Sequence, residues 1–222
     1  MIVLGIETAT RVCGAGLAGR EGLLADIRIH RGFTHAERLT EAVEGIVRDA
    51  GYALSDLEGI AVSIGPGSFT GLRIGLGFAK GLAMGLSLPL AAVATPDSLI
   101  DPVPAFCPAA WVLIPARKGE AYRRIYTSRN GAWLPEGPTH EIRMKDLGGQ
   151  VPDDPILILG PGDDPEAVSE KDHPAIRRVD PVHSLPSGYL IARLGRKKLL
   201  SGQAEDLDAL VPRYIKRFQG VR

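Results

Sequence analysis

Short runs of apolar residues, separated by turns, dominate the first part of the chain. Residues 2–6 (IVLGI) are apolar without interruption, as expected of a central strand. The runs at 12–18 and 23–29 predict two further strands, which turn at 19–22 where two glycines occur. Three strands in succession are therefore expected before the first helix.

Apolar residues then recur at helical spacing, with charged residues between them. This pattern predicts an amphipathic helix over residues 35–50 that ends near Gly51. Thr34 is its expected N-cap, and Glu37 the capping-box partner. The apolar stripe consists of Leu39, Val43, Ile46 and Val47.

The pattern then alternates between strand and helix. A strand is expected at 59–64, a glycine-rich loop follows, a helix continues to Leu86, and another strand occupies 88–93. The expected order is β-β-β-α-β-α-β, which makes this an α/β protein.

Four prolines between positions 96 and 108 predict an irregular passage, so a boundary is expected near residue 100. The two predicted units are residues 1–100 and 101–222. A hairpin flanking the sequence RKGE opens the second unit, and a strand with a glycine loop at 156–162 repeats the theme of the first unit. The second unit is therefore expected to be a degraded copy of the first. Its last two expected features are a long surface excursion at 135–155 and a helix at 187–200.

Charge and composition narrow the function classes. The 222 residues carry 26 Lys and Arg and 26 Asp and Glu, so no overall field attracts nucleic acid or an anionic membrane. Cys13 and Cys107 lack metal-site spacing and are expected to be buried thiols. The apolar stretch at 74–94 contains Pro89 and five glycines, so a membrane span is not expected. The start of the chain lacks an export signal, and the expected location is cytoplasmic.

The loop at 63–75, SIGPGSFTGLRIG, resembles phosphate-binding loops but matches none of their patterns. A Walker loop needs a lysine directly after its last glycine, and the first lysine here is Lys80. The dinucleotide fingerprint needs G-x-G-x-x-G, and this loop does not contain that spacing. A nucleophile elbow needs a glycine two residues before and two residues after the serine, and Ser68 has neither. A general anion site at the helix N-terminus and a plain structural turn remain equally open.

The helix after this loop places Gly77, Gly81 and Gly85 on one face. Each glycine in a helix interior costs about 1 kcal/mol relative to alanine, so a close neighbour is expected to offset the cost. On the residues alone, the favoured neighbour is the protein's own helix at 35–50, and a helix of another chain is the alternative.

Candidates for metal or acid–base chemistry are few. The five histidines include no pair at i, i+4, so a zinc site is not expected. Glu7 and Thr8 end the first strand, where α/β folds place functional groups. The basic residues of the last part of the chain, among them Arg193, Arg196 and Lys197, suggest first a solvated face and second a local RNA contact.

Five segments resemble the bacterial TsaB family of tRNA threonylcarbamoyladenosine biosynthesis proteins. They are LGIETAT, THAERL, SIGPGSFTGLRIGLGFAKGLAMGLSLPL, ARKGEAYRRIY and VPRYIKR, in the order and spacing of that family. The resemblance spans nearly the whole chain, and GPGSFTGLRIG is its most specific part. It implies the actin, Hsp70 and sugar-kinase (ASKHA) fold with two tandem subdomains.

The resemblance also implies a function: a non-catalytic relative of TsaD that supports threonylcarbamoyl transfer to the tRNA adenosine next to the anticodon. Expected partners are TsaD in a heterodimer, the ATPase TsaE, tRNA through the complex, and a second copy when the chain is alone. No cofactor is firmly expected, although ATP or ADP fits the interface with TsaD. Weak nucleotide contacts are predicted at Glu7, Thr8, Gly65, Gly67 and Ser68. The predicted interface residues are His35, Leu39, Val43, Val47, Leu72, Ile74, Gly77, Phe78, Gly81 and Gly85.

Three departures from the family patterns bear on catalysis. TsaD-like enzymes carry two metal-binding histidines at i and i+4 in the first helix. Here the residue four positions after His35 is Leu39, so the second histidine is missing. Glu7 replaces the usual aspartate of TsaB, and Pro115 stands where an aspartate is usual. These departures favour a scaffold, while an ATPase of the same fold is the alternative and a peptidase ranks last.

Overall fold

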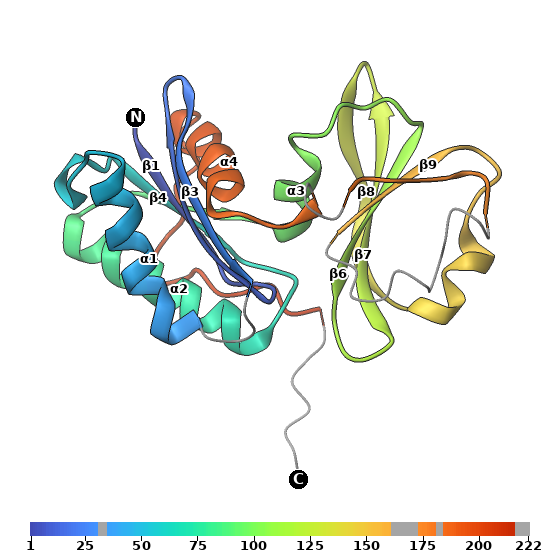
Figure 1. Ribbon diagram of the computed structural model, residues 1–222, viewed down its shortest axis with the longest axis horizontal. Coiled ribbons are helices and arrows are strands. Elements are labelled where there is room, and N and C mark those ends of the chain that lie inside the picture. The colour runs from blue at the N-terminus through green and yellow to red at the C-terminus, as the bar shows by residue number, and fades with distance from the viewer. Residues whose placement is uncertain (31–34, 161–172, 181–183, 216–222) are drawn as a thin grey trace, which may run out of the picture.

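The computed structural model describes residues 1–30, 35–160, 173–180 and 184–215, which form two α/β units side by side (Figure 1). Each unit is built on a five-stranded sheet, with the orders β3-β2-β1-β4-β5 and β10-β9-β6-β7-β8. In both sheets the middle strand pairs antiparallel with a hairpin on one side and parallel with later strands on the other. The second sheet therefore repeats the topology of the first.

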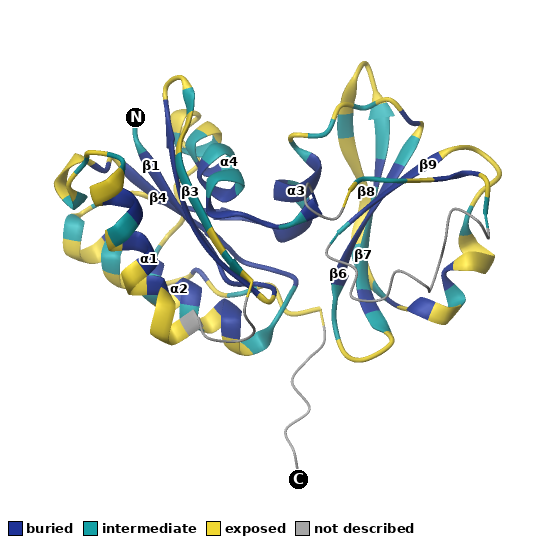
Figure 2. Cartoon of the chain, in the orientation of Figure 1, coloured by how far each residue is buried: buried dark blue, intermediate teal, exposed yellow. Residues whose placement is uncertain are grey.

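The first unit follows the expected order of elements. Its strands are β1 (Val3–Glu7), β2 (Val12–Gly19), β3 (Gly22–His30), β4 (Gly59–Ser63) and β5 (Leu90–Val93), and its helices are α1 (His35–Asp49), η1 (Leu54–Asp56) and α2 (Phe69–Leu86). Helices α1 and α2 cover one face of the sheet, with their buried sides inward and their exposed sides outward (Figure 2). The expected N-cap Thr34 lies outside the described residues.

The second unit contains α3 (Thr95–Ile100), β6 (Ala109–Pro115), β7 (Glu120–Arg129), β8 (Ala132–Arg143), η2 (Met144–Asp146), η3 (Gly148–Gln150), β9 (Ile156–Leu159) and β10 (Ile176–Arg178). Helix α4 (Gly188–Leu200) follows. Cys13 and Cys107 are buried free thiols, as expected.

Two predictions for this unit are wrong, and proline explains both. The passage after residue 94 is not wholly irregular, because Pro96 occupies the first turn of α3, where no backbone donor is needed. Much of the expected surface excursion at 135–155 is strand β8, which contains Pro135 and Pro138. Because β8 is an edge strand, those residues need not donate to a further strand.

The helices α3 and α4 cross between the units. Helix α3 follows the last strand of the first sheet but packs on the second, where Leu99 and Ile100 join the core of β6 and β9. Helix α4 follows the second sheet and returns to the first, where Ile191 and Ala192 pack on the face opposite α1 and α2. The chain beyond residue 100 thus completes the first unit as well as building the second.

Candidate functional site

The glycine loop between β4 and α2 packs tightly on the turn that follows β1. The Ser68 amide donates a hydrogen bond to the carbonyl oxygen of Ala9 at 2.6 Å. A Cβ placed on Gly67 would lie 2.1 Å from that same oxygen, so only glycine fits there. Gly65 has a φ of +100°, the left-handed region that favours glycine. These glycines allow two backbone segments to touch.

The C-terminal segment covers the same loop from another side. The Arg213 amide donates to the carbonyl oxygen of Ile64 at 2.8 Å. The carbonyl oxygen of Arg213 lies 3.1 Å from the position that a Cβ on Gly65 would take. Carbonyl oxygens repel an anion, and two of them, from Ala9 and Arg213, face this loop. The residues present therefore do not fit a phosphate cradle at Gly65 and Gly67.

Ser68 serves the start of α2. Its hydroxyl oxygen accepts a hydrogen bond from the Gly71 amide at 3.2 Å, and its carbonyl oxygen accepts one from the Leu72 amide at 2.9 Å. The side chain is thus an N-cap that satisfies one of the first free amides of the helix. Thr8 also binds α2, because its hydroxyl donates to the carbonyl oxygen of Gly71 at 2.8 Å.

Glu7 is fully buried at the end of β1. Its Oε1 accepts a hydrogen bond from the Ala9 amide at 2.6 Å, whereas Oε2 meets no donor among the described residues. Burial raises the pKa of Glu7 to about 7, against the opposing effect of the Ala9 amide. No group of three or more metal-ligating side chains occurs in the described ranges. Glu7 alone supplies too few ligands for a metal site.

The outer face of α2 is the second candidate, and here one prediction is wrong. Gly77, Gly81 and Gly85 are exposed, and a Cβ added at any of them would meet nothing within 4 Å. The sequence favoured the protein's own helix α1 as their close neighbour. Within the described chain, these three glycines instead face open space.

The other predicted interface residues divide into two groups. Leu39, Val43, Val47 and Leu72 are at most 3% exposed and belong to the first core, which leaves them no surface for a partner. Ile74 and Phe78 are half-buried and pack against that core from its edge. The side chain of His35 lies outside the described residues. The structure thus assigns the open part of the surface to α2 rather than to the apolar stripe of α1.

Sequence reasoning missed an aromatic cluster at the first turn of α2. The Arg73 guanidinium lies 4.0 Å above the ring of Phe69, and its Nε donates to the Tyr214 hydroxyl at 3.1 Å. The Phe69 and Tyr214 rings lie 4.9 Å apart. The sequence carried no clear signal for this contact, because Tyr214 and Arg73 are 141 residues apart in the chain.

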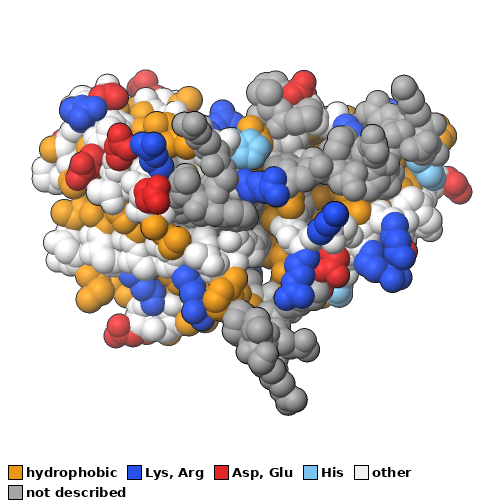
Figure 3. Space-filling model, turned by 60° about the horizontal axis from the view of Figure 1, so that its bottom comes forward, with side chains coloured by type: hydrophobic (Ala, Val, Ile, Leu, Met, Phe, Trp, Pro, Cys, Tyr) orange, Lys and Arg blue, Asp and Glu red, His pale blue; other side chains and the backbone are white. Residues whose placement is uncertain are grey.

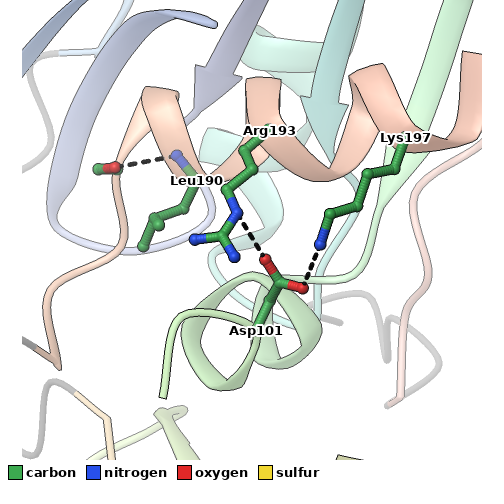
Figure 4. A network of polar contacts seen from close by, with 5 residues as sticks. Asp101, Leu190, Arg193 and Lys197 are labelled. Atoms are coloured by element: carbon green, nitrogen blue, oxygen red, sulfur yellow. Dashed lines mark hydrogen bonds and ion pairs between the residues drawn. The ribbon is translucent and has the colours of Figure 1, made fainter. Parts of the chain in front are cut away.

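The basic residues of α4 are held within the molecule. Arg193 and Lys197 reach opposite oxygens of the Asp101 carboxylate at the end of α3, at 3.1 and 2.8 Å (Figure 4). Arg196 donates to the carbonyl oxygen of Met1, and Lys198 to that of Ala92. These side chains join the two units and the sheet edge, so the predicted RNA contact finds no support at α4.

Comparison with known proteins identifies relatives across the chain. The family model described as TsaD, tRNA N6-adenosine threonylcarbamoyltransferase, matches residues 32–131. The TsaB protein of Bacillus subtilis (strain 168) is 28% identical over 97% of this chain and 94% of its own length. The TsaB protein of Escherichia coli (strain K12) is 35% identical over 68% of this chain and 69% of its own length.

Solved structures agree with the fold. YeaZ from Pseudomonas aeruginosa matches 96% of this chain and 99% of its own, with a TM-score of 0.78 and 24% identity. The activator of 2-hydroxyisocaproyl-CoA dehydratase from Clostridium difficile matches 91% and 97%, with a TM-score of 0.53 and 9% identity. These likenesses show an ASKHA-like α/β fold. Among the described helices, none combines the length and the apolar character that crossing a membrane requires.

Proposed function

The chain belongs to the TsaB family, and from that premise we propose that it is a non-catalytic subunit that supports TsaD by binding it through the outer face of α2. Family membership gives it a role in tRNA threonylcarbamoyladenosine biosynthesis. The finer proposal rests on one observation: a Cβ added at any of the three open glycines of α2 would meet no described part of the chain within 4 Å.

The glycine face is costly for the chain alone. Each of the three glycines costs about 1 kcal/mol relative to alanine, and no contact with the described part of the chain offsets that cost. A helix of a partner that approaches the bare backbone would offset it, because small residues allow close helix packing. Met84, which is 66% exposed, and the half-buried Phe78 would add apolar contact area beside the glycines.

Two features support a scaffold over an enzyme. Leu39, at the position of a metal-binding histidine in TsaD-like enzymes, is 1% exposed and part of the hydrophobic core. The carbonyl groups of Ala9 and Arg213 lie close to Gly67 and Gly65 of the glycine loop, and Glu7 is withdrawn from solvent. We therefore propose that a nucleotide, if the complex uses one, binds where TsaD contributes residues, and that TsaE and tRNA join the same cytoplasmic complex.

Substitution of the open glycines tests the interface. We expect Gly77→Leu to weaken binding of TsaD from the same organism at least tenfold by isothermal titration calorimetry, because the leucine overpacks the contact. Gly148→Leu is the control, since Gly148 is also open and exposed but lies in the second unit. Unchanged TsaD binding by Gly77→Leu would refute the interface.

The same face is the proposed contact between two copies when the chain is alone. Light scattering of Gly77→Leu should then show fewer dimers than the unsubstituted chain. An ATPase of the same fold is the alternative function, and it predicts saturable nucleotide binding by the isolated chain. A titration of the isolated chain with ATP distinguishes the two, because the scaffold proposal expects no saturation without TsaD.

A further inference from the structure

A cluster of cations lies at one end of the second sheet. The turn between β6 and β7 carries Arg117 and Lys118, which are both exposed. It is a tight turn, in which Gly119 has a φ of +74° and the Glu120 amide donates to the carbonyl oxygen of Arg117 at 2.9 Å. The two cationic side chains are therefore carried on a fixed backbone.

A second pair of cations adjoins this turn. Strand β8 ends at Arg143, which pairs with Glu120 across the sheet, and the Met144 amide donates to the carbonyl oxygen of Gly119 at 2.9 Å. Lys145 follows and is exposed. Two adjacent turns thus present four cations to the same end of the sheet.

Most of this charge is not neutralised within the described chain. Arg143 forms an ion pair with Asp146 at 2.6 Å. The side chains of Arg117, Lys118 and Lys145 have no ion pair or hydrogen bond with any described residue, and Glu120, the other carboxylate here, is half-buried. In the space-filling view, Lys and Arg side chains gather on the face of the second unit (Figure 3). The basic residues of α4 differ, because each of them forms an ion pair or a hydrogen bond within the chain.

We propose that the β6–β7 turn and the adjoining end of β8 contact the phosphate backbone of tRNA. Unpaired cations on a rigid turn suit phosphates, which bind Lys and Arg with little need for apolar contact. A protein interface needs an apolar centre. The exposed large apolar side chains of the described chain lie elsewhere, and several of them, Met84, Val211, Tyr214 and Ile215, lie on α2 or in the C-terminal segment near it.

The proposed surface is separate from the α2 face but on an accessible side of the molecule. The described C-terminal segment ends between the two units at the lower side of Figure 1, the side on which the β6–β7 turn also lies. This inference goes beyond the proposed scaffold, which could assist TsaD without touching RNA.

Charge reversal on matched turns tests the surface. The test variant is Arg117→Glu with Lys118→Glu. Its control is Arg20→Glu with Arg129→Glu, which makes the same change in charge at exposed positions of the β2–β3 and β7–β8 hairpins, at the opposite ends of the sheets (Figure 1). Binding of fluorescently labelled, unmodified tRNA is measured by anisotropy at two salt concentrations, with each variant in complex with TsaD.

We expect the test variant to bind tRNA about tenfold more weakly at low salt, and its affinity to depend less steeply on salt, because it has lost phosphate contacts. The control should stay within about twofold of the unsubstituted chain, since nonspecific charge effects are equal in both variants. Equal losses in both variants, or no loss in the test variant, would overturn the proposal.

Two further measurements keep the outcomes separable. Thermal unfolding of each variant shows that it is folded, and Lys118→Ala, which removes one exposed side chain, replaces the double variant if that one is not. Calorimetry measures the binding of each variant to TsaD, and this separates the proposed RNA contact from the proposed scaffold function. Loss of tRNA binding with TsaD binding intact supports the RNA surface, whatever the result at Gly77.

Discussion

Glycines in two regions of the first unit have different surroundings. Where α4 crosses the sheet, Gly5, Gly16 and Gly188 lie against backbone, and a Cβ on any of them would come within 2.3 Å of another main-chain atom. On the outer face of α2, a Cβ added at Gly77, Gly81 or Gly85 would meet none of the residues that the structure describes within 4 Å. In the first set, each glycine allows another backbone segment to pack closely against it. The second set also consists of glycines, but no described segment packs against them.

The outer face of α2 is therefore best explained as a binding surface. A helix that approaches a sheet closely gains contact along the whole backbone, and that gain offsets the entropy lost by each glycine. At α4 the packing contact lies within the chain. At the outer face of α2 the entropy is lost but no described residue supplies the contact, so a second molecule is its simplest source.

The packed glycines should be the least tolerant positions in the first unit. We expect Gly5→Ala to lower the free energy of unfolding by about 3 kcal/mol or more, because its Cβ would meet the Gly188 carbonyl oxygen at 2.1 Å and the Ala192 nitrogen at 2.3 Å. Urea denaturation followed by circular dichroism measures the loss. Gly148→Ala, at an open position, is the control. Equal stability of the two variants would show that α4 can move away at little cost.

The same close packing should make stability depend on pH through Glu7. Residues 5 and 7 of β1 point to the same face of the sheet, and Glu7 lies beside Gly14, whose Cβ position is 3.1 Å from the Gly188 nitrogen. Water is therefore excluded from the carboxyl group, and its pKa is about 7 in the folded chain against 4.5 for an unperturbed glutamate. The folded state keeps a proton that the unfolded state has already lost.

The sign of the effect follows from this difference. Between pH 4.5 and 7 the folded state binds more protons than the unfolded state, so the contribution of Glu7 to stability falls as pH rises, by up to about 3 kcal/mol. Glu7→Gln keeps an acceptor for the Ala9 amide and cannot ionise, so the difference in stability between the variant and the unsubstituted chain should grow in its favour over this range. A constant difference from pH 4.5 to 8 would contradict the burial of a titrating Glu7.

Strand order was predictable from the sequence, whereas the placement of α4 was not. Continuous apolar runs identified β1, β4 and β9 because such strands are buried on both faces. An apolar pattern shows that α4 has a buried side, but not which sheet it covers. The missed signal was in the strands, where Gly5, Gly14 and Gly16 mark close approach by another backbone.

The candidate site was predictable in its residues and not in its surroundings. The sequence identified the glycine stripe of α2, but on the residues alone it favoured α1 over a helix of another chain as the neighbour, because pattern alone cannot say what faces an exposed row. It also placed weak nucleotide contacts at Gly65 and Gly67, whereas the Ala9 and Arg213 carbonyl groups that fill this space come from segments distant in the chain. Contacts between distant segments are what periodicity does not encode.

The smallest expected effect is also the most direct test of the comparison, because two glycines of α2 only two residues apart differ in the same way: one has a close neighbour and the other has none among the described residues. A Cβ on Gly75 would lie 2.1 Å from the Thr8 hydroxyl, whereas one on Gly77 would meet nothing. In the isolated chain, Gly77→Ala should raise the free energy of unfolding by about 0.5–1 kcal/mol by restricting the unfolded state, and Gly75→Ala should lower it by displacing Thr8. Urea denaturation at low protein concentration, where self-association is weakest, measures both. If Gly77→Ala stabilised the chain alone and yet weakened TsaD binding, the glycine would be costly to the fold and useful to the complex; if it destabilised the chain, α2 would have an internal neighbour and the contrast between the two faces would fail.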